Sequence, residues 1–152
     1  MRLLFLSYYF EPDLCAGSFR NTPLFQEIRS RLGMNDYIHV ITTQPNRYNT
    51  FKAFGQAKEY GENYVVDRIA VPEHKGGMLD QARSFFVFYR EAMKKVKHED
   101  FDLVYASSSR LFTAFLGKQI ATSKKSLLYL DIRDIFVDTM KDVLKNRKIL
   151  QV

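Results

Sequence analysis

The sequence has a single cysteine, Cys15, among its 152 residues. One cysteine excludes an intrachain disulfide and fits a reducing cytoplasm. No apolar stretch approaches the roughly 20 residues that cross a bilayer. The short apolar run at the N-terminus leads into Glu11-Pro12-Asp13 and has no small-residue cleavage site, so it does not read as a secretory signal. We therefore expect a cytoplasmic protein, either free or peripheral at the inner face of the plasma membrane.

Several ligand-binding motifs are also missing. The three histidines, His39, His74 and His98, do not have the spacing of metal ligands, so we expect no metal. Gly17 does not belong to a G-x-G-x-x-G sequence, which disfavours a dinucleotide cofactor. The net charge of +6 favours partners that carry phosphate, but no stacking or groove-reading motif accompanies it, and we expect no nucleic acid.

What the sequence does contain is an alternation of short apolar runs with segments of helical periodicity. The first run, Arg2–Leu6, is apolar on both faces, as in a buried parallel strand. Expected strands span residues 2–6, 37–42, 64–71, 102–106 and 126–130. Four helices are expected: one that begins at Ser18 or Thr22, two that span 79–97 and 111–121, and a last one from Phe136. Residues 43–63 are predicted to form a long polar excursion from the sheet, that is, a long loop. This order predicts one α/β domain over residues 1–152: a doubly wound, Rossmann-like parallel sheet of about five or more strands, with helices on both faces in three αβα layers.

In such a sheet, ligands bind beyond the carboxyl ends of the strands, near the point where the strand order reverses. The loop after the first strand ends in Gly17, Ser18 and Arg20. Gly17 would let a phosphate approach the backbone at a helix N-terminus, and Arg20 could add a charge-assisted contact. The alternative is a turn glycine beside a solvated arginine.

Two later loops should meet the first one at that edge. Ser107 and Ser108 follow the fourth expected strand, and the charged Asp131-Ile132-Arg133-Asp134 follows the fifth. Asp134 could orient or deprotonate a hydroxyl, Arg133 could hold a phosphate or carboxylate, and Asp131 could brace Arg133. An ordinary ion pair at the end of a strand is the alternative.

The aromatic run from Phe85 to Tyr89 is apolar around two helical turns and is followed by Lys and Arg. Such a composition is typical of a helix that touches a membrane surface. Burial between the sheet and a neighbouring helix is the alternative, and we favour it.

Three stretches carry a family resemblance: MRLLFLSYYFEPDLCAGSFR from Met1, DLVYASSSRLFTAFLGK from Asp102, and LYLDIRDIFVD from Leu128. In this order and spacing the chain resembles the N-terminal domain of a family 4 glycosyltransferase of the GT-B fold. The likeness is to bacterial enzymes of capsule and O-antigen sugar assembly. The family pattern departs at Ile135-Phe136-Val137, where Leu-Trp-Pro is usual, and at Ser109-Arg110, where a proline follows the serine pair.

The resemblance implies a retaining, metal-independent transferase. It would move a sugar from a nucleoside-diphosphate sugar to a saccharide or polyprenyl-linked acceptor in cell-surface polysaccharide synthesis, without a cofactor. The implied residues are Asp134 and Arg133 for catalysis; Gly17, Ser18 and Arg20 for the donor diphosphate; and Asp131, Ser107 and Ser108 on the acceptor side. A C-terminal donor-binding domain does not follow in these 152 residues, so we expect the second GT-B half in cis or in trans and little transfer by this chain alone. A non-enzymatic α/β module that docks on a membrane-surface complex through its aromatic-basic helix is the alternative function.

Overall fold

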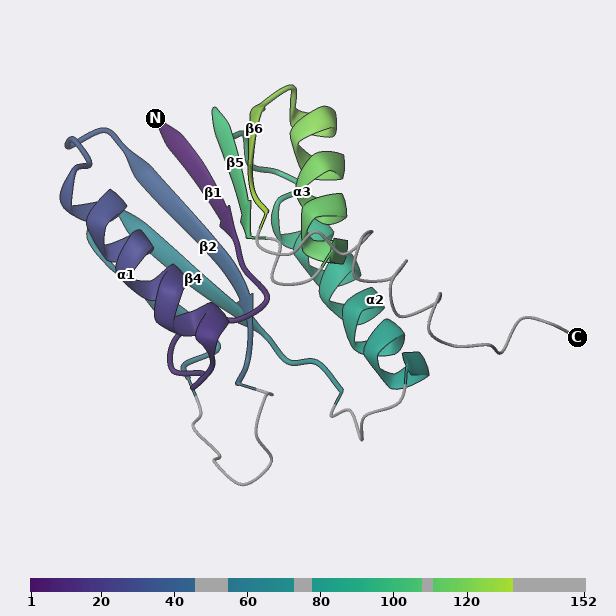
Figure 1. Cartoon of the computed structure of the whole chain (residues 1–152). Helices are drawn as coiled ribbons and strands as arrows, with labels where there is room; N and C mark the ends of the chain where they lie inside the picture. Colours follow the sequence, from purple (N-terminus) through teal and green to yellow (C-terminus); the bar gives the residue numbers. More distant parts are fainter. Residues whose placement is uncertain (46–54, 73–77, 108–110, 133–152) are drawn as a thin grey trace, which may run out of the picture.

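The computed structural model describes residues 1–45, 55–72, 78–107 and 111–132 (Figure 1). Its elements are β1 (Arg2–Leu6), α1 (Ala16–Ser30), β2 (Tyr37–Thr43), β3 (Lys58–Tyr60), β4 (Tyr64–Ile69), α2 (Met78–Lys95), β5 (Leu103–Ser107), α3 (Leu111–Lys124) and β6 (Leu127–Asp131). The five expected strands are therefore present, with shifts of one or two residues at their ends. The helix expected after Phe136 lies outside the described residues.

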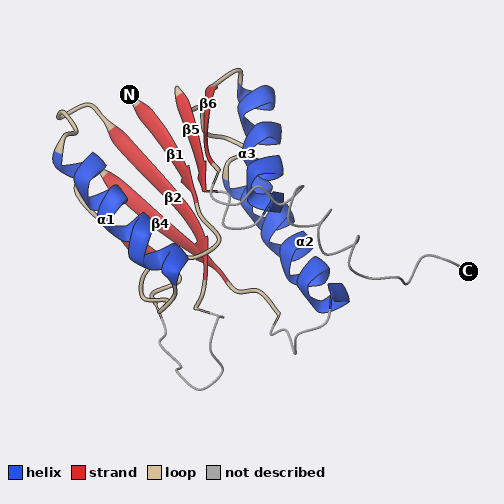
Figure 2. Cartoon of the chain, in the orientation of Figure 1, coloured by secondary structure: helices blue, strands red, loops and turns tan. Residues whose placement is uncertain are grey.

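The strands form one six-stranded sheet in the order β3-β4-β2-β1-β5-β6 (Figure 2). The pairs along the series β4, β2, β1, β5 and β6 are parallel, whereas β3 is antiparallel to β4. The sheet is thus mixed and mostly parallel, which confirms the α/β class. The expectation of an all-parallel sheet was wrong at β3, and the doubly wound three-layer arrangement stays a prediction.

The strand β3 lies inside the segment expected to be a polar excursion. It pairs with β4 through a tight turn in which the Gly61 amide donates to the Tyr64 carbonyl at 2.9 Å. A Cβ on Gly61 would lie 1.9 Å from the Tyr64 ring, so this turn requires a glycine. Because β3 has three residues and two of them are charged, no apolar alternation marks it in the sequence.

The strand β1 lies at the centre of the parallel part, between β2 and β5. The chain runs from β1 through β2 to β4 on one side and returns to β5 and β6 on the other, so the strand order reverses between β1 and β5. The register pairs Leu6 with Ala106 at the carboxyl ends of these two strands. The prediction that the first and fourth expected strands are neighbours is therefore confirmed.

The side chains of β1 alternate between two separate apolar clusters. Leu3 and Phe5 pack with Phe25 of α1, whereas Leu4 and Leu6 pack with residues of α2 and α3. Accordingly, α1 lies on one side of the sheet and α2 and α3 lie on the other (Figure 1). The helix α3 approaches β5 closely because Gly117 has no side chain: a Cβ there would lie 2.6 Å from the Cβ of Ala106.

The start of α1 differs from both sequence-based alternatives. The helix begins at Ala16 with Cys15 as its N-cap, so neither Ser18 nor Thr22 caps it, and Pro23 lies inside it. A proline inside a helix removes one hydrogen bond and costs about 3 kcal/mol. We attribute the early start to tertiary packing, because Gly17, Ser18 and Asn21 in this part of the helix are all buried.

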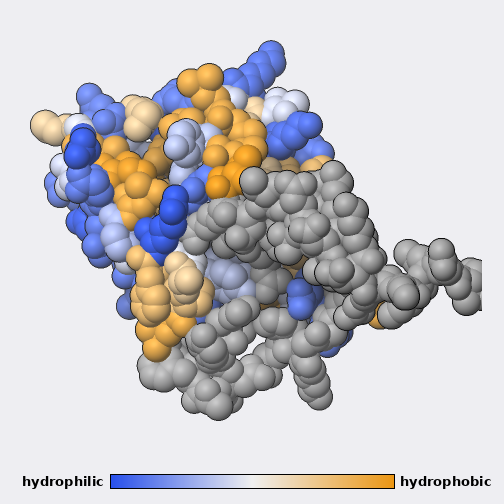
Figure 3. Space-filling model, in the orientation of Figure 1, coloured by the Kyte–Doolittle hydropathy of each residue, from blue (hydrophilic) through white to orange (hydrophobic). Residues whose placement is uncertain are grey.

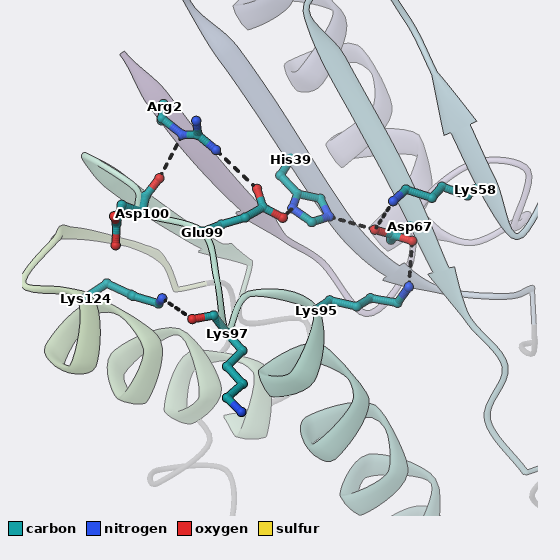
Figure 4. A network of polar contacts seen from close by, with 9 residues as sticks. All are labelled: Arg2, His39, Lys58, Asp67, Lys95, Lys97, Glu99, Asp100 and Lys124. Atoms are coloured by element: carbon teal, nitrogen blue, oxygen red, sulfur yellow. Dashed lines mark hydrogen bonds and ion pairs between the residues drawn. The ribbon is translucent and has the colours of Figure 1, made fainter.

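A polar network on the α2 side of the sheet ties β2 and β4 to the end of α2 (Figure 4). His39 is buried, with its Nε2 2.9 Å from Asp67 and its Nδ1 3.0 Å from Glu99. Lys95 donates to the second oxygen of Asp67 at 2.6 Å, and Arg2 lies 3.4 Å from Glu99. His39 is therefore part of a buried polar network between the sheet and the end of α2.

Asp67 should contribute stability that depends on pH. Burial raises its pKa, but the hydrogen bonds from His39 and Lys95 outweigh this effect and lower the pKa from 3.8 to about 2. The contribution to the free energy of unfolding is therefore present above pH 4 and is lost as the pH falls towards 2; it amounts to about 2 kcal/mol.

Urea unfolding of Asp67→Asn should show this loss of stability already at pH 7 and a flatter dependence of stability on pH below pH 4. Glu62→Gln, an exposed control, should behave as the parent; equal pH profiles for all three proteins would contradict the assignment.

Candidate functional site

The candidate site lies where the carboxyl ends of β1, β5 and β6 meet the N-terminus of α1. Parallel strands end on the same edge of a sheet, so the loops after these strands converge there. The loop after β1 leads into α1, β5 ends at Ser107, and β6 ends at Asp131. This is the edge at which the sequence placed the site.

Beneath this edge, Asn21 joins three segments of the chain. Its fully buried amide donates to the Ser7 hydroxyl at 2.6 Å and lies 3.3 Å from the Ser107 hydroxyl. The Ser7 hydroxyl in turn donates to the Tyr9 carbonyl at 2.6 Å. These bonds fix the first turns of α1 against the ends of both β1 and β5, directly beneath the candidate site.

Gly17 is the second residue of α1 and packs on Tyr9. A Cβ at this position would lie 3.1 Å from the Cβ of Tyr9 and 3.2 Å from its ring, which is tighter than ordinary contact. Gly17 is therefore a helical glycine at a close approach, and the alternative of a turn glycine was wrong. Its predicted contact with a diphosphate stays a prediction, as does that of the neighbouring buried Ser18.

Arg20 and Asp131 meet across the site. The guanidinium Nη2 of Arg20 lies 2.7 Å from Asp131 Oδ1, and the Tyr105 hydroxyl donates to Asp131 Oδ2 at 3.1 Å. The Arg20 side chain is 59% exposed, whereas that of Asp131 is 10% exposed. Arg20 is therefore the solvated helix residue of the alternative interpretation and also forms an ion pair with Asp131.

The remaining predicted residues divide into two groups. Ser107 is buried in the Asn21 network, and a role towards an acceptor stays a prediction. Ser108, Arg133 and Asp134 lie outside the described residues. The predicted pairing of Asp131 with Arg133 therefore lies outside the described residues. Among the described residues, Asp131 contacts the guanidinium of Arg20.

Sequence reasoning missed four residues that shape this edge: Ser7, Asn21, Tyr105 and Thr113. A signal was present for Asn21, because a polar residue among apolar helical neighbours often marks a buried hydrogen-bond network. Thr113 is also buried, and its hydroxyl has no hydrogen-bond partner among the residues that the structure describes. It lies one helical turn before Gly117, on the side of α3 that faces the sheet.

The described residues contain no group of three or more His, Cys, Asp or Glu side chains placed to hold a metal ion. Across the same part of the chain, none of the helices combines the length and the apolar character that a membrane crossing needs. The candidate site combines a helix N-terminus, whose amides carry partial positive charge, with an oriented guanidinium, and both kinds of group can donate hydrogen bonds to an anion.

Comparison with known proteins returned no matching family model and no matching curated protein. Among solved structures, the chain is similar to the C-terminal domain of a hydrogenase from Pyrococcus furiosus. The two share 12% sequence identity over 86% of this chain and 90% of the other, with a TM-score of 0.49. This likeness carries no argument about the site or its chemistry.

The Asn21 network yields a stability prediction. Asn21→Ala should lower the free energy of unfolding by about 2 kcal/mol, since it removes the amide that Ser7 and Ser107 contact and leaves a gap beneath the site. Gln26→Ala removes an exposed amide from the same helix and should change it by no more than about 0.5 kcal/mol. Chemical denaturation of both variants measures the difference, and equal stability would show that the network is dispensable.

Proposed function

We propose that residues 1–152 form the N-terminal, Rossmann-like domain of a retaining glycosyltransferase of the GT-B type. The enzyme would transfer a sugar from a nucleoside-diphosphate sugar to a saccharide or polyprenyl-linked acceptor in cell-surface polysaccharide synthesis. The observation that supports this most is the 2.7 Å contact between Arg20 and Asp131. Two of the three segments that carry the family resemblance, the loop into α1 and the charged end of β6, meet through this contact at one edge of the sheet.

The electrostatics of this edge suit a diphosphate. The first turn of α1 contains no acidic residue, so nothing in that turn opposes an anion at its amides. Arg20 lies just beyond the same turn with its guanidinium turned to solvent. A guanidinium and helix amides together offer charged and neutral donors to phosphate oxygens.

The proposed chemistry relies on placement of the substrates and on charge stabilisation. When the sugar–phosphate bond breaks, negative charge builds up on the departing diphosphate, and donors fixed beforehand lower the barrier most effectively. In this proposal Asp131 and Tyr105 fix Arg20 for that purpose, and Gly17 and Ser18 supply backbone N–H groups. Arg133 and Asp134 would position the acceptor hydroxyl. The second GT-B half would supply most of the donor contacts, so this chain alone should show little or no transfer.

The role of Arg20 gives the first test. Titration of the chain with uridine diphosphate, guanosine diphosphate and inorganic pyrophosphate by calorimetry should show weak binding to the diphosphate group. Arg20→Gln should reduce that affinity about tenfold, since it removes one charge-assisted hydrogen bond. Arg31→Gln is a matched control, because Arg31 lies at the opposite end of α1 and pairs with Glu27 at 2.5 Å. It should leave the affinity unchanged.

Two results would count against the proposal. One is no binding of any diphosphate to the chain, either by itself or together with a C-terminal donor-binding half. The other is an equal loss of affinity in Arg20→Gln and Arg31→Gln, which would indicate attraction by overall positive charge without a defined site.

A further inference from the structure

A second surface lies on the outer side of α2 and α3. The two helices enclose an open groove of about 690 Å³, lined mainly by aromatic side chains and bounded by Leu130 of β6. We call it the α2/α3 groove. Exposed hydrophobic residues continue from it along β6, where Leu128 lies on the same face of the strand as Leu130 and is 36% exposed. Figure 3 shows hydrophobic residues gathered at several places on one face of the molecule. An apolar surface of this extent commonly marks an interaction site.

The aromatic run of α2 is divided between the core and this surface. Phe85 and Phe88 are buried but Phe86 is 63% exposed, so the favoured alternative of burial holds for only part of the run. On α3, Phe112 and Phe115 are each about half exposed. The rings are held in place, since Phe112 stacks on Phe85 at 4.7 Å between centroids. The groove therefore presents ordered aromatic rings to solvent.

Unpaired cations flank these rings. Arg83 lies one turn before Phe86, Lys118 lies one turn after Phe115, and neither forms an ion pair with any residue that the structure describes. By contrast, Glu91 further along α2 is neutralised by Arg90 at 3.1 Å and by Lys94 at 2.9 Å. The surface thus combines apolar rings with free positive charge.

We propose that the α2/α3 groove is a docking surface for an anionic lipid bilayer. Aromatic rings insert at the boundary between headgroups and acyl chains, while Lys and Arg contact the lipid phosphates, so the two kinds of side chain act together. The net charge of +6 adds long-range attraction to such a surface. The inference does not depend on the proposed transferase activity, because it rests on other residues.

The absence of tryptophan from the sequence allows a direct test. Phe86→Trp introduces a single emitter into the groove. Its fluorescence should shift to the blue with vesicles of phosphatidylglycerol and phosphatidylcholine, and it should be quenched by brominated lipids. Met34→Trp is the matched control, because Met34 lies between α1 and β2, at the opposite edge of the sheet from the candidate site, and is fully exposed. Its emission should not change.

Co-sedimentation with the same vesicles measures the strength of binding. Phe86→Asp should weaken partitioning about tenfold or more, and Arg83→Gln with Lys118→Gln should weaken it about fivefold per charge. Met34→Asp should bind as the parent, and all variants should keep the parent's circular dichroism and diphosphate affinity. Binding to pure phosphatidylcholine should be at least tenfold weaker than to anionic vesicles.

The proposal is overturned if folded Phe86→Asp sediments with vesicles as the parent does, or if Met34→Asp loses binding equally. Self-association of the parent that Phe86→Asp abolishes, without any vesicle binding, would overturn it in favour of a second copy of the chain as the occupant. Loss of diphosphate binding in Arg20→Gln leaves the vesicle result unchanged, so the two proposals can fail separately.

Discussion

The strand β1 is apolar on both of its faces, and this constraint organises the described structure. Leu3 and Phe5 must be covered on one side of the sheet and Leu4 and Leu6 on the other, which requires helices on both. Because β1 also has a parallel neighbour on each edge, the chain has to leave it in one direction and return in the other. The central position of β1 therefore makes the strand order reverse between β1 and β5. At this reversal, the loop after β1 and the N-terminus of α1 lie at one edge of the sheet.

Hydrogen bonds at that edge hold the residues of the candidate site against one another. Asn21 joins the ends of β1 and β5 to α1, and Asp131 joins the end of β6 to Arg20. Both sets of contacts act on the first turns of α1, so they fix the direction of the helix amides and of the exposed guanidinium. The aromatic and basic α2/α3 groove begins at Leu130, next to Asp131 in the sequence. The groove lies on the α2 and α3 side of the sheet, whereas the Arg20–Asp131 contact lies on the α1 side.

Much of this arrangement could be predicted from local patterns. Short apolar runs identified β1, β2, β4, β5 and β6, because a buried parallel strand must be apolar along its length. The convergence of the loops after β1, β5 and β6 followed from the general behaviour of parallel sheets, and the Arg20–Asp131 contact agrees with it. The pairing itself could not be predicted, since the two residues are 111 positions apart.

The errors have physical causes in contacts that are distant in sequence. The start of α1 depends on the packing of Gly17 on Tyr9 and on Asn21, whose partner Ser107 lies 86 positions away. The strand β3 depends on its pairing with β4, not on its own residues. Which rings of the run from Phe85 to Tyr89 face the core depends on where α3 packs, so sequence alone could not separate Phe85 from Phe86.

The central claim is that the carboxyl edge of β1, β5 and β6 binds the diphosphate of a nucleotide sugar. Amide chemical-shift mapping of the isotopically labelled chain with uridine diphosphate tests it most directly. The account predicts the largest changes at Gly17, Ser18 and Arg20, with none at His39 and Asp67 towards the other side of the fold. Changes confined to the His39 network, or no changes at saturating nucleotide, would contradict it.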